Sequence, residues 1–370
     1  MKSKFFILAL ITAAIAGNFI SCTKETNAGS TPVVTELNLP ATAYHYNSCI
    51  SNDNVITLGR VLFYDTKLST NNTIACGSCH KQSTAFSDNV KFSTGFESKL
   101  TKRNTPPIQN LQNSLNFIVN NGQSSGLSNS LFWDGRETFL PNMVLKPVLN
   151  HIEMGINSMD EIVNKVKATP YYKDLFEKAF PTEEINITNL AKALSSFTAS
   201  IISSNTKFDN VSNQTATFSA LEEQGRNLFF SKYNCNGCHQ TQSLNGYEQG
   251  GGFVNIGLDG NYTDNGRGGI TNNSGDNGKF KIPNLRNVTV TAPYMHDGRF
   301  TSLEQVLDHY SHNIKNHPNL DPRLVGANGM PIQMNISGQE KAAIIAFLGT
   351  LTDYSMITDV KFSNPFVVKK

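Results

Sequence analysis

Apolar residues recur at helical spacing along much of the chain, and we find no sustained run of alternating apolar and polar residues typical of strands. Residues three and four apart share one face of a helix, and the segment 187–204 places on such a face Leu190, Leu194, Phe197 and Ile201. The segment 341–353 carries a similar stripe of Ile344, Phe347, Leu348 and Leu351. The pattern predicts a mainly α-helical protein.

Two serines mark expected helix starts. Ser158 and Ser337 are each followed three residues later by a glutamate, which is typical of a capping box. The first precedes a helical pattern over 162–180. The segment 245–279 is instead dense in Gly and Asn, and we expect it to be a long loop without regular elements.

The first 22 residues resemble an export signal. A basic start is followed by an apolar run over 5–15, which is too short to be a convincing membrane span. The run ends in Phe-Ile-Ser-Cys, similar to a bacterial lipobox, although Phe19 departs from the usual Leu. We therefore expect a lipoprotein-type signal over 1–21, lipidation of Cys22 and a flexible tether over 22–45. The alternative is ordinary cleavage, and both imply export.

Composition adds two exclusions. The net charge is +2, which gives no indication of nucleic-acid binding. The chain has six cysteines, but Cys22 lies at the processing site and four others form two Cys-x-x-Cys-His motifs. Only Cys49 is left, so we expect no disulfide framework and interpret Cys49 as a buried or unreactive thiol.

The two motifs predict covalent haem. In such a motif the thiols add to the porphyrin vinyl groups, and the adjacent imidazole becomes the proximal iron ligand. The attachment residues are Cys76, Cys79, His80, Cys235, Cys238 and His239. With His80 and His239 binding the two irons, the chain is expected to hold two haem c groups.

A weak internal repeat precedes the motifs. "LGRVLFYD" over 58–65 and "QGRNLFFS" over 224–231 stand at matching positions. Two unrelated amphipathic helices are the alternative. We expect two domains with one haem each, the first over 46–205, the second over 206–355, and a C-terminal tail over 356–370. The Gly-rich loop would wrap the edge of the second haem.

The chain resembles the bacterial dihaem cytochrome c peroxidases and the related enzyme MauG. The matching pieces run in order from Leu58 to Asp353: "LGRVLFYDTKLSTNNTIACGSCH", "KRNTPP", "FWDGR", "KPVLNHIEMG", "GRNLFF", "CNGCH", "FKIPNLRNVTVTAPYMHDGRFTSLEQVLDHY" and "EKAAIIAFLGTLTD". The resemblance implies two mainly α-helical cytochrome c-like domains with the haems facing a shared interface. It also implies a peroxidatic first haem and an electron-transferring second haem.

The resemblance assigns two catalytic residues. Trp133 matches the family's Trp between the haems, although a large aromatic could serve only core packing. Glu153 matches the distal carboxylate, which would move a proton from the inner to the outer peroxide oxygen so that water leaves. Without the resemblance, a surface Glu would be the simpler interpretation. Met143 stands where a Gln is often found, and His151 could supply polarity in its place.

The resemblance also implies a calcium ion between the domains. Asn104 would offer a side-chain carbonyl, and Thr291 and Pro293 would offer main-chain carbonyls. No acidic cluster marks this site in the sequence.

Two departures concern the sixth iron ligands. Typical family peroxidases cap the resting first haem with a His about sixteen residues after the proximal one, and Phe96 stands there. Because Phe cannot ligate iron, we predict an open first haem. On the second haem the usual Met is replaced by Tyr310, as in MauG. A Tyr ligand would favour oxidised iron, and Met295 or His309 are the alternatives.

The leading hypothesis is an exported dihaem peroxidase that reduces hydrogen peroxide to water. The expected donor is a small protein such as a monohaem cytochrome c or a cupredoxin. We expect it in the periplasm, attached to the outer membrane only through a lipid, and the resemblance also allows a homodimer. The alternatives are a MauG-like enzyme that oxidises a protein or other substrate, and a non-enzymatic electron-transfer cytochrome.

Overall fold

The structure is a computed structural model that describes residues 37–39, 44, 52–111, 130–239 and 252–366. All described residues belong to one compact unit, Val34–Lys370. The predicted signal, Cys22 and Cys49 lie outside the described residues. Within the described ranges, no helix is long and apolar enough to cross a membrane.

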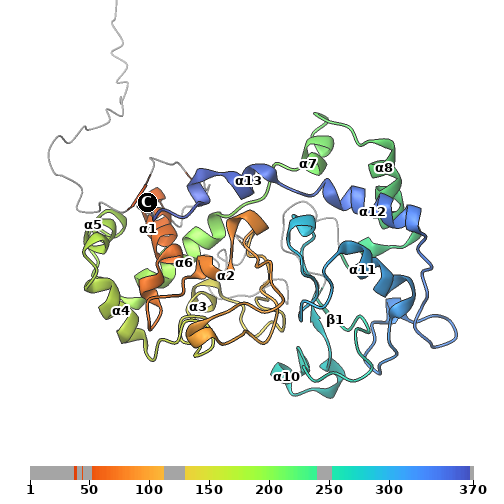
Figure 1. The fold of residues 1–370 in the computed structure, drawn as a ribbon, viewed down its shortest axis with the longest axis horizontal. Coiled ribbons are helices and arrows are strands. Elements are labelled where there is room, and N and C mark those ends of the chain that lie inside the picture. The colour runs from red at the N-terminus through yellow and green to blue at the C-terminus, as the bar shows by residue number, and fades with distance from the viewer. Residues whose placement is uncertain (1–36, 40–43, 45–51, 112–129, 240–251, 367–370) are drawn as a thin grey trace, which may run out of the picture. The chain divides into compact units, whose positions relative to one another are not determined.

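The residues that precede Ser203 form a helical group around α1 (Asp53–Tyr64). This helix packs against α5 (Pro170–Ala179) and, most extensively, α6 (Ile187–Ser200) (Figure 1). α2 (Cys76–Cys79), α3 (Leu140–Met143) and α4 (Met159–Lys167) complete the group. Aliphatic and aromatic side chains from these helices form one buried core.

A second helical group follows, in which α8 (Ala220–Asn227) packs against α12 (Gly338–Gly349) (Figure 1). Its other α-helices are α7 (Lys207–Ser212), α10 (Gly268–Thr271) and α11 (Leu303–Asp308). The helix α13 (Tyr354–Thr358) instead contributes Met356 to the core of the first group. The strands β1 (Phe253–Val254) and β2 (Phe280–Lys281) pair antiparallel, with Phe253 opposite Lys281. Single π-helical turns occupy Leu228–Lys232 and His309–Asn313.

Short 3₁₀ turns connect these elements. They cover Thr66–Leu68, Gln82–Thr84, Phe96–Ser98, Cys235–Gly237, Ser274–Asp276, Val288–Val290, Pro322–Leu324 and Val360–Phe362.

The internal repeat has a structural basis in a close helix crossing. A Cβ on Gly59 of α1 would collide with the carbonyl oxygen of Ala193 on α6. A Cβ on Gly225 of α8 would collide in the same way with the carbonyl of Ala343 on α12. Glycine is therefore required for each pair of backbones to approach. The repeat therefore marks the same kind of close helix crossing in both helical groups.

The aromatic residues of the repeat also make equivalent contacts in the two helical groups. Phe63, four residues after Gly59, contacts Phe197 with ring centroids 5.2 Å apart. Phe229, four residues after Gly225, contacts Phe347 at 5.4 Å. Each pair lies one helical turn beyond its crossing glycine, because residues four apart share a face. The boundaries of the two predicted domains remain a prediction.

The last described residues pack on the first helical group. The Arg60 guanidinium donates from Nε to the Ser363 carbonyl at 2.7 Å, and the Tyr64 hydroxyl donates to the Phe362 carbonyl at 2.7 Å. Phe362 is buried in the core of this group. The described part of the predicted tail therefore covers α1.

Three sequence predictions need correction. The pattern over 162–180 spans two helices, because Pro170 begins α5 and its ring cannot continue α4. The segment 245–279, as far as it is described, contains β1, α10 and a 3₁₀ turn as well as loop. Both expected helix starts are confirmed, because the Ser158 hydroxyl accepts from the amide of Glu161 and the Ser337 hydroxyl from that of Glu340. The second capping box is complete, whereas in the first the Glu161 carboxylate accepts from the amide of Asn157 and not from that of Ser158.

Candidate active site

The first Cys-x-x-Cys-His motif forms one turn of helix with its imidazole at the end. His80 follows α2 directly, and its Nδ1–H donates a 2.8 Å hydrogen bond to the carbonyl of Phe86. Burial lowers the pKa of His80, so the ring is neutral. A neutral imidazole with Nδ1 occupied leaves Nε2 free for a metal. Cys76 and Cys79 are free thiols.

The second motif repeats this arrangement. His239 donates from Nδ1 to the carbonyl of Pro283 at 3.1 Å, and burial lowers its pKa to about 4. Cys235 and Cys238 are again free thiols. The Arg323 guanidinium donates to the carbonyl of Gly237 inside the motif. Two unpaired thiols and an oriented neutral imidazole suit haem c attachment in both places.

A cavity of about 950 Å³ adjoins the first motif. This volume lies at the upper end of the range for cofactor pockets, about 300–1,000 Å³. Its lining includes all three residues of the first motif, both predicted catalytic residues and the carbonyl partner of His239: Cys76, Cys79, His80, Trp133, Glu153 and Pro283. The structure thus brings together the residues expected around the first haem.

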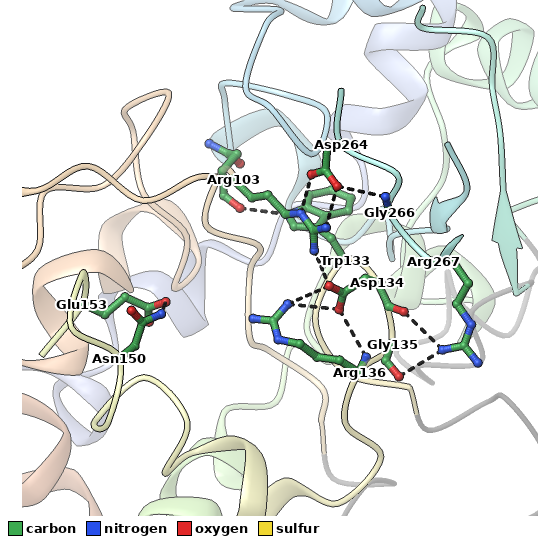
Figure 2. Close-up of polar contacts among 11 residues, drawn as sticks. Arg103, Trp133, Asp134, Gly135, Arg136, Asn150, Glu153, Asp264, Gly266 and Arg267 are labelled. Atoms are coloured by element: carbon green, nitrogen blue, oxygen red, sulfur yellow. Dashed lines mark hydrogen bonds and ion pairs between the residues drawn. The ribbon is translucent and has the colours of Figure 1, made fainter. Parts of the chain in front are cut away.

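Glu153 lines this cavity from the loop that follows α3. The Asn150 side-chain amide donates a 2.7 Å hydrogen bond to its Oε1 (Figure 2). Burial raises the pKa of Glu153, while the charge of Arg136 and the Asn150 hydrogen bond act against the rise. A carboxyl group whose pKa lies above its ordinary value can both take up and release a proton.

The polar substitute proposed from sequence does not reach this cavity. His151 is exposed and is not among the residues that line it. Met143, at the position where the family often has Gln, does line it. The prediction for His151 was therefore wrong, because two residues along a turn bring a side chain to a different side.

Phe96 lies beside the main chain of Glu153 and outside the cavity lining. Its amide donates a 2.8 Å hydrogen bond to the carbonyl of Glu153, and its ring packs against Gly155. Gly155 has φ +75°, and a Cβ there would contact the Phe96 ring. The residue at the position of the family's capping His therefore supports the loop that carries Glu153.

Trp133 is held by two hydrogen bonds, and in each of them its partner is a main-chain group. Its indole Nε1–H donates to the carbonyl of Asn104 at 2.8 Å (Figure 2), and its own carbonyl accepts from the amide of Lys281 on β2 at 2.8 Å. Two residues beyond Lys281, Pro283 accepts the hydrogen bond of His239. The Trp133 segment therefore connects the first cavity to the segment that orients the second imidazole.

A charged network fixes the loop of Trp133 (Figure 2). Arg103 donates to Asp134 at 2.5 Å and to both oxygens of Asp264 at 2.7 and 2.8 Å. Arg136 shares Asp134 at 3.0 Å, and Arg267 donates to the Asp134 carbonyl at 3.2 Å. The sequence analysis did not assign these residues. Arg103 lies within the "KRNTPP" piece, and Asp134 and Arg136 lie within the "FWDGR" piece. Asp264 lies in the Gly-rich segment, where no sequence pattern marked it.

Tyr310 lies in a π-helical turn near the second pair of thiols. Burial raises its pKa, with further contributions from Cys238 and Cys235. Among the described residues, no hydrogen bond is recorded for its hydroxyl. His309 directs Nε2 to the carbonyl of Ile256 at 2.9 Å, which leaves that nitrogen unavailable to iron.

Met295, the other candidate for the second haem, and Thr291 and Pro293, the predicted calcium ligands, lie on one segment of the chain. Met295 occupies a left-handed turn at φ 72°. The amide of Asn104 donates to the carbonyl of His296 at 2.8 Å, and its side-chain amide donates to the carbonyls of Val90 and Lys91. This brings Asn104 to the segment that carries Thr291 and Pro293. The calcium ligand set remains a prediction.

Sequence comparison defines the class of the protein. A profile of the di-haem cytochrome c peroxidases matches residues 53–217. The methylamine utilization protein MauG of Methylorubrum extorquens is 32% identical over 299 residues, covering 80% of this chain and 77% of that protein. A cytochrome c551 peroxidase of Nitrosomonas europaea is 31% identical over 310 residues, covering 81% and 80%.

A solved structure agrees. A MauG-like protein associated with microbial copper homeostasis superposes with a TM-score of 0.72 at 33% identity, covering 85% of this chain and 94% of that one. The chain belongs to the di-haem cytochrome c peroxidase and MauG family, and it is an oxidoreductase of the peroxidase type. This sets aside the alternative of a purely electron-carrying cytochrome.

Proposed function

We propose that this protein reduces hydrogen peroxide to water at the haem attached to Cys76 and Cys79, with Glu153 as acid and base. The observation that carries the proposal is the position of Glu153 on the same cavity as His80, with a carboxyl group whose pKa is raised. The absence of Phe96 from the residues lining this cavity supports an open iron site.

The chemistry divides between cofactor and protein. The haem supplies the iron that binds and reduces peroxide. Glu153 accepts the proton of the inner peroxide oxygen and returns it to the outer oxygen, so that the leaving group is water and not hydroxide. Asn150 holds Oε1 in place for this transfer. The carbonyl of Phe86 orients the neutral ring of His80, the proposed proximal ligand.

Electrons would enter through the second haem and pass by way of Trp133. The short chain segment between Lys281 and Pro283 supports this route, because one end bonds to Trp133 and the other to His239. The Arg103 guanidinium joins the Trp133 loop, through Asp134, to Asp264. We propose a small redox protein, such as a monohaem cytochrome c or a cupredoxin, as the donor.

A MauG-like activity is the second candidate, and Tyr310 favours it. A phenolate ligand is anionic and would lower the potential of the second haem, which opposes electron entry from an ordinary donor. Such an enzyme would use peroxide to oxidise a protein or another substrate. We propose Tyr310 as the sixth ligand, because His309 is bonded elsewhere.

Location and the calcium site complete the proposal. We propose export to the periplasm with a lipid on Cys22, and a calcium ion held by Asn104, Thr291 and Pro293. Oxygen ligands from two separate segments suit a hard cation. A homodimer, as is frequent in the family, is part of the proposal.

Donor-coupled turnover distinguishes the two candidates. Peroxide consumption is followed together with oxidation of a reduced monohaem cytochrome c. The peroxidase predicts two donor molecules oxidised per peroxide. Peroxide consumption without donor oxidation supports the MauG-like activity, and no consumption contradicts both.

A further inference from the structure

Two tyrosines share one buried carboxylate next to the first haem motif. The hydroxyls of Tyr171 and Tyr172, on α5, both donate to Oδ2 of Asp65 at 2.6 and 2.7 Å. Tyr172 has no exposed surface, and Asp65 is 3% exposed. The two rings lie with centroids 4.8 Å apart. The other oxygen of Asp65 accepts from the amide of Lys67 at 2.9 Å.

The carboxylate of Asp65 is buried and held by neutral donors. It accepts hydrogen bonds from the two phenols and from the Lys67 amide, and among the described residues it forms no ion pair. The Lys67 ammonium lies instead over the Tyr171 ring, 4.9 Å from its centroid. The carboxylate is in place to accept the proton that a phenol releases once it is oxidised. Burial and the charge of Asp65 raise the pKa of Tyr172, so its proton stays on the ring oxygen at rest.

The helix α1 connects the cluster to the first haem site. Asp65 directly follows this helix, and Phe63 on it lines the cavity. Cys76 packs against the same core that contains Tyr172, and its thiol contributes to the raised pKa of that tyrosine. Tunnelling from a buried ring to a neighbouring redox group requires closeness and not contact.

We propose that Tyr171, Tyr172 and Asp65 form a redox site that accepts oxidising equivalents from the first haem site when no donor is present. The inference rests on the proposed function, because hydrogen peroxide is the oxidant. Reduction of one peroxide to two waters takes two electrons, which the two haems would supply, and two protons, which come from solvent. Without a donor, Tyr172 would replace one of these electrons, and its O–H bond breaks as the proton forms a new O–H bond on Asp65. A neutral tyrosyl radical remains on Tyr172. It passes to Tyr171 when that ring gives an electron to Tyr172, Asp65 returns the first proton to Tyr172, and Asp65 takes the proton of Tyr171 in its place.

Tyr64 supplies the matched comparison. Its ring packs against Gly77 within the first motif, so it is at least as well placed for electron loss. Its hydroxyl, however, donates to the carbonyl of Phe362, which cannot hold a proton at neutral pH. An oxidised phenol is a strong acid and needs a base to become a stable radical. Proximity alone would therefore select Tyr64, whereas proton transfer selects Tyr172.

The test uses the haem-loaded protein with one equivalent of hydrogen peroxide and no donor. Samples are frozen for electron paramagnetic resonance, and the haem absorption is recorded in parallel. We expect a tyrosyl signal in the wild type and in Tyr64→Phe. The signal should fall at least tenfold in Tyr172→Phe and in Asp65→Asn. The Tyr171→Phe,Tyr172→Phe protein should show more oxidation of Met143 and Met154, which line the cavity, by mass spectrometry.

The outcomes separate the two proposals. A haem spectrum that responds to peroxide without a tyrosyl signal, or with a signal equal in all variants, overturns the redox site and leaves the peroxidase intact. Loss of the signal in Tyr64→Phe alone also overturns it. A haem spectrum that does not respond to peroxide contradicts the proposed function and removes the oxidant on which the redox site depends. Tyr172→Phe keeps the ring and its packing, so its result does not depend on how well Asp65→Asn folds.

Discussion

The main-chain amide of Phe96 donates a 2.8 Å hydrogen bond to the carbonyl oxygen of Glu153. The residue that stands where family peroxidases carry a capping His thus helps to hold the main chain of Glu153, the proposed acid–base residue. Gly155 permits this contact, since its positive φ and missing Cβ leave room for the Phe96 ring. This arrangement supports the proposal that the first haem reacts with peroxide without prior displacement of a ligand.

Glu153→Gln should slow the reaction with peroxide by about 10²- to 10⁴-fold, the usual contribution of a positioned acid–base group. The amide keeps the size of the side chain but cannot accept the proton. Stopped-flow measurement of the haem absorption change gives the rate. Glu97→Gln is the control, because Glu97 is an exposed carboxylate that forms an ion pair with Lys99. An unchanged rate in Glu153→Gln would remove this residue from the mechanism.

The pH profile should depend on Arg136. Glu153 acts first as a base, so the rate falls when the pH drops below its pKa. Burial raises that pKa, and the Arg136 charge opposes the rise. Arg136→Gln should therefore move the acid limb of kcat/KM to higher pH, while Asp134 keeps its bond to Arg103. Lys99→Gln, which removes a charge on the Phe96 loop, should leave the limb in place, and a shift toward lower pH in Arg136→Gln would refute the assignment.

Tyr310→Phe should change the spectrum of the second haem and raise its potential, because the anionic ligand is lost. Tyr262→Phe serves as the control. Its hydroxyl bonds to Asn255 and to the amide of Leu258, so it is not available to iron. Absorption and resonance Raman spectra report the ligand, and redox titration reports the potential. Identical spectra for wild type and Tyr310→Phe would exclude Tyr310 as a ligand.

The crossing glycines should be essential for stability. Gly59→Ala and Gly225→Ala each force a methyl group against a neighbouring carbonyl, and overpacking of this kind costs about 1–3 kcal/mol. Gly349→Ala in α12 meets no atom within contact distance and should be neutral or slightly stabilising. Urea unfolding of the haem-loaded proteins measures the difference. Equal midpoints for all three variants would show that the repeat is not a packing constraint.

Local signals in the sequence were sufficient for the helical class and for both haem motifs. The Cys-x-x-Cys-His spacing is a short-range requirement, and the structure orients both His80 and His239 through a carbonyl partner. The repeat around Gly59 and Gly225 was also visible, because the same backbone approach needs the same small residue. Pro170 was a readable break between α4 and α5 that the helical periodicity concealed.

Long-range contacts were not predictable from local patterns. Arg103 and Asp264 are 161 residues apart, and no periodicity links them. Asp65 and Tyr172 form their hydrogen bond across 107 residues. His151 shows the opposite error, because closeness to Glu153 in sequence did not place it in the cavity. Such partners are set by how helices pack, which a single sequence does not show.

The ferric absorption spectrum of the resting protein, recorded before and after one equivalent of hydrogen peroxide, tests the central claim most directly. An open first haem predicts a high-spin component that changes at once on adding peroxide, without prior reduction. Two fully low-spin haems that do not respond until the protein is reduced would contradict the account.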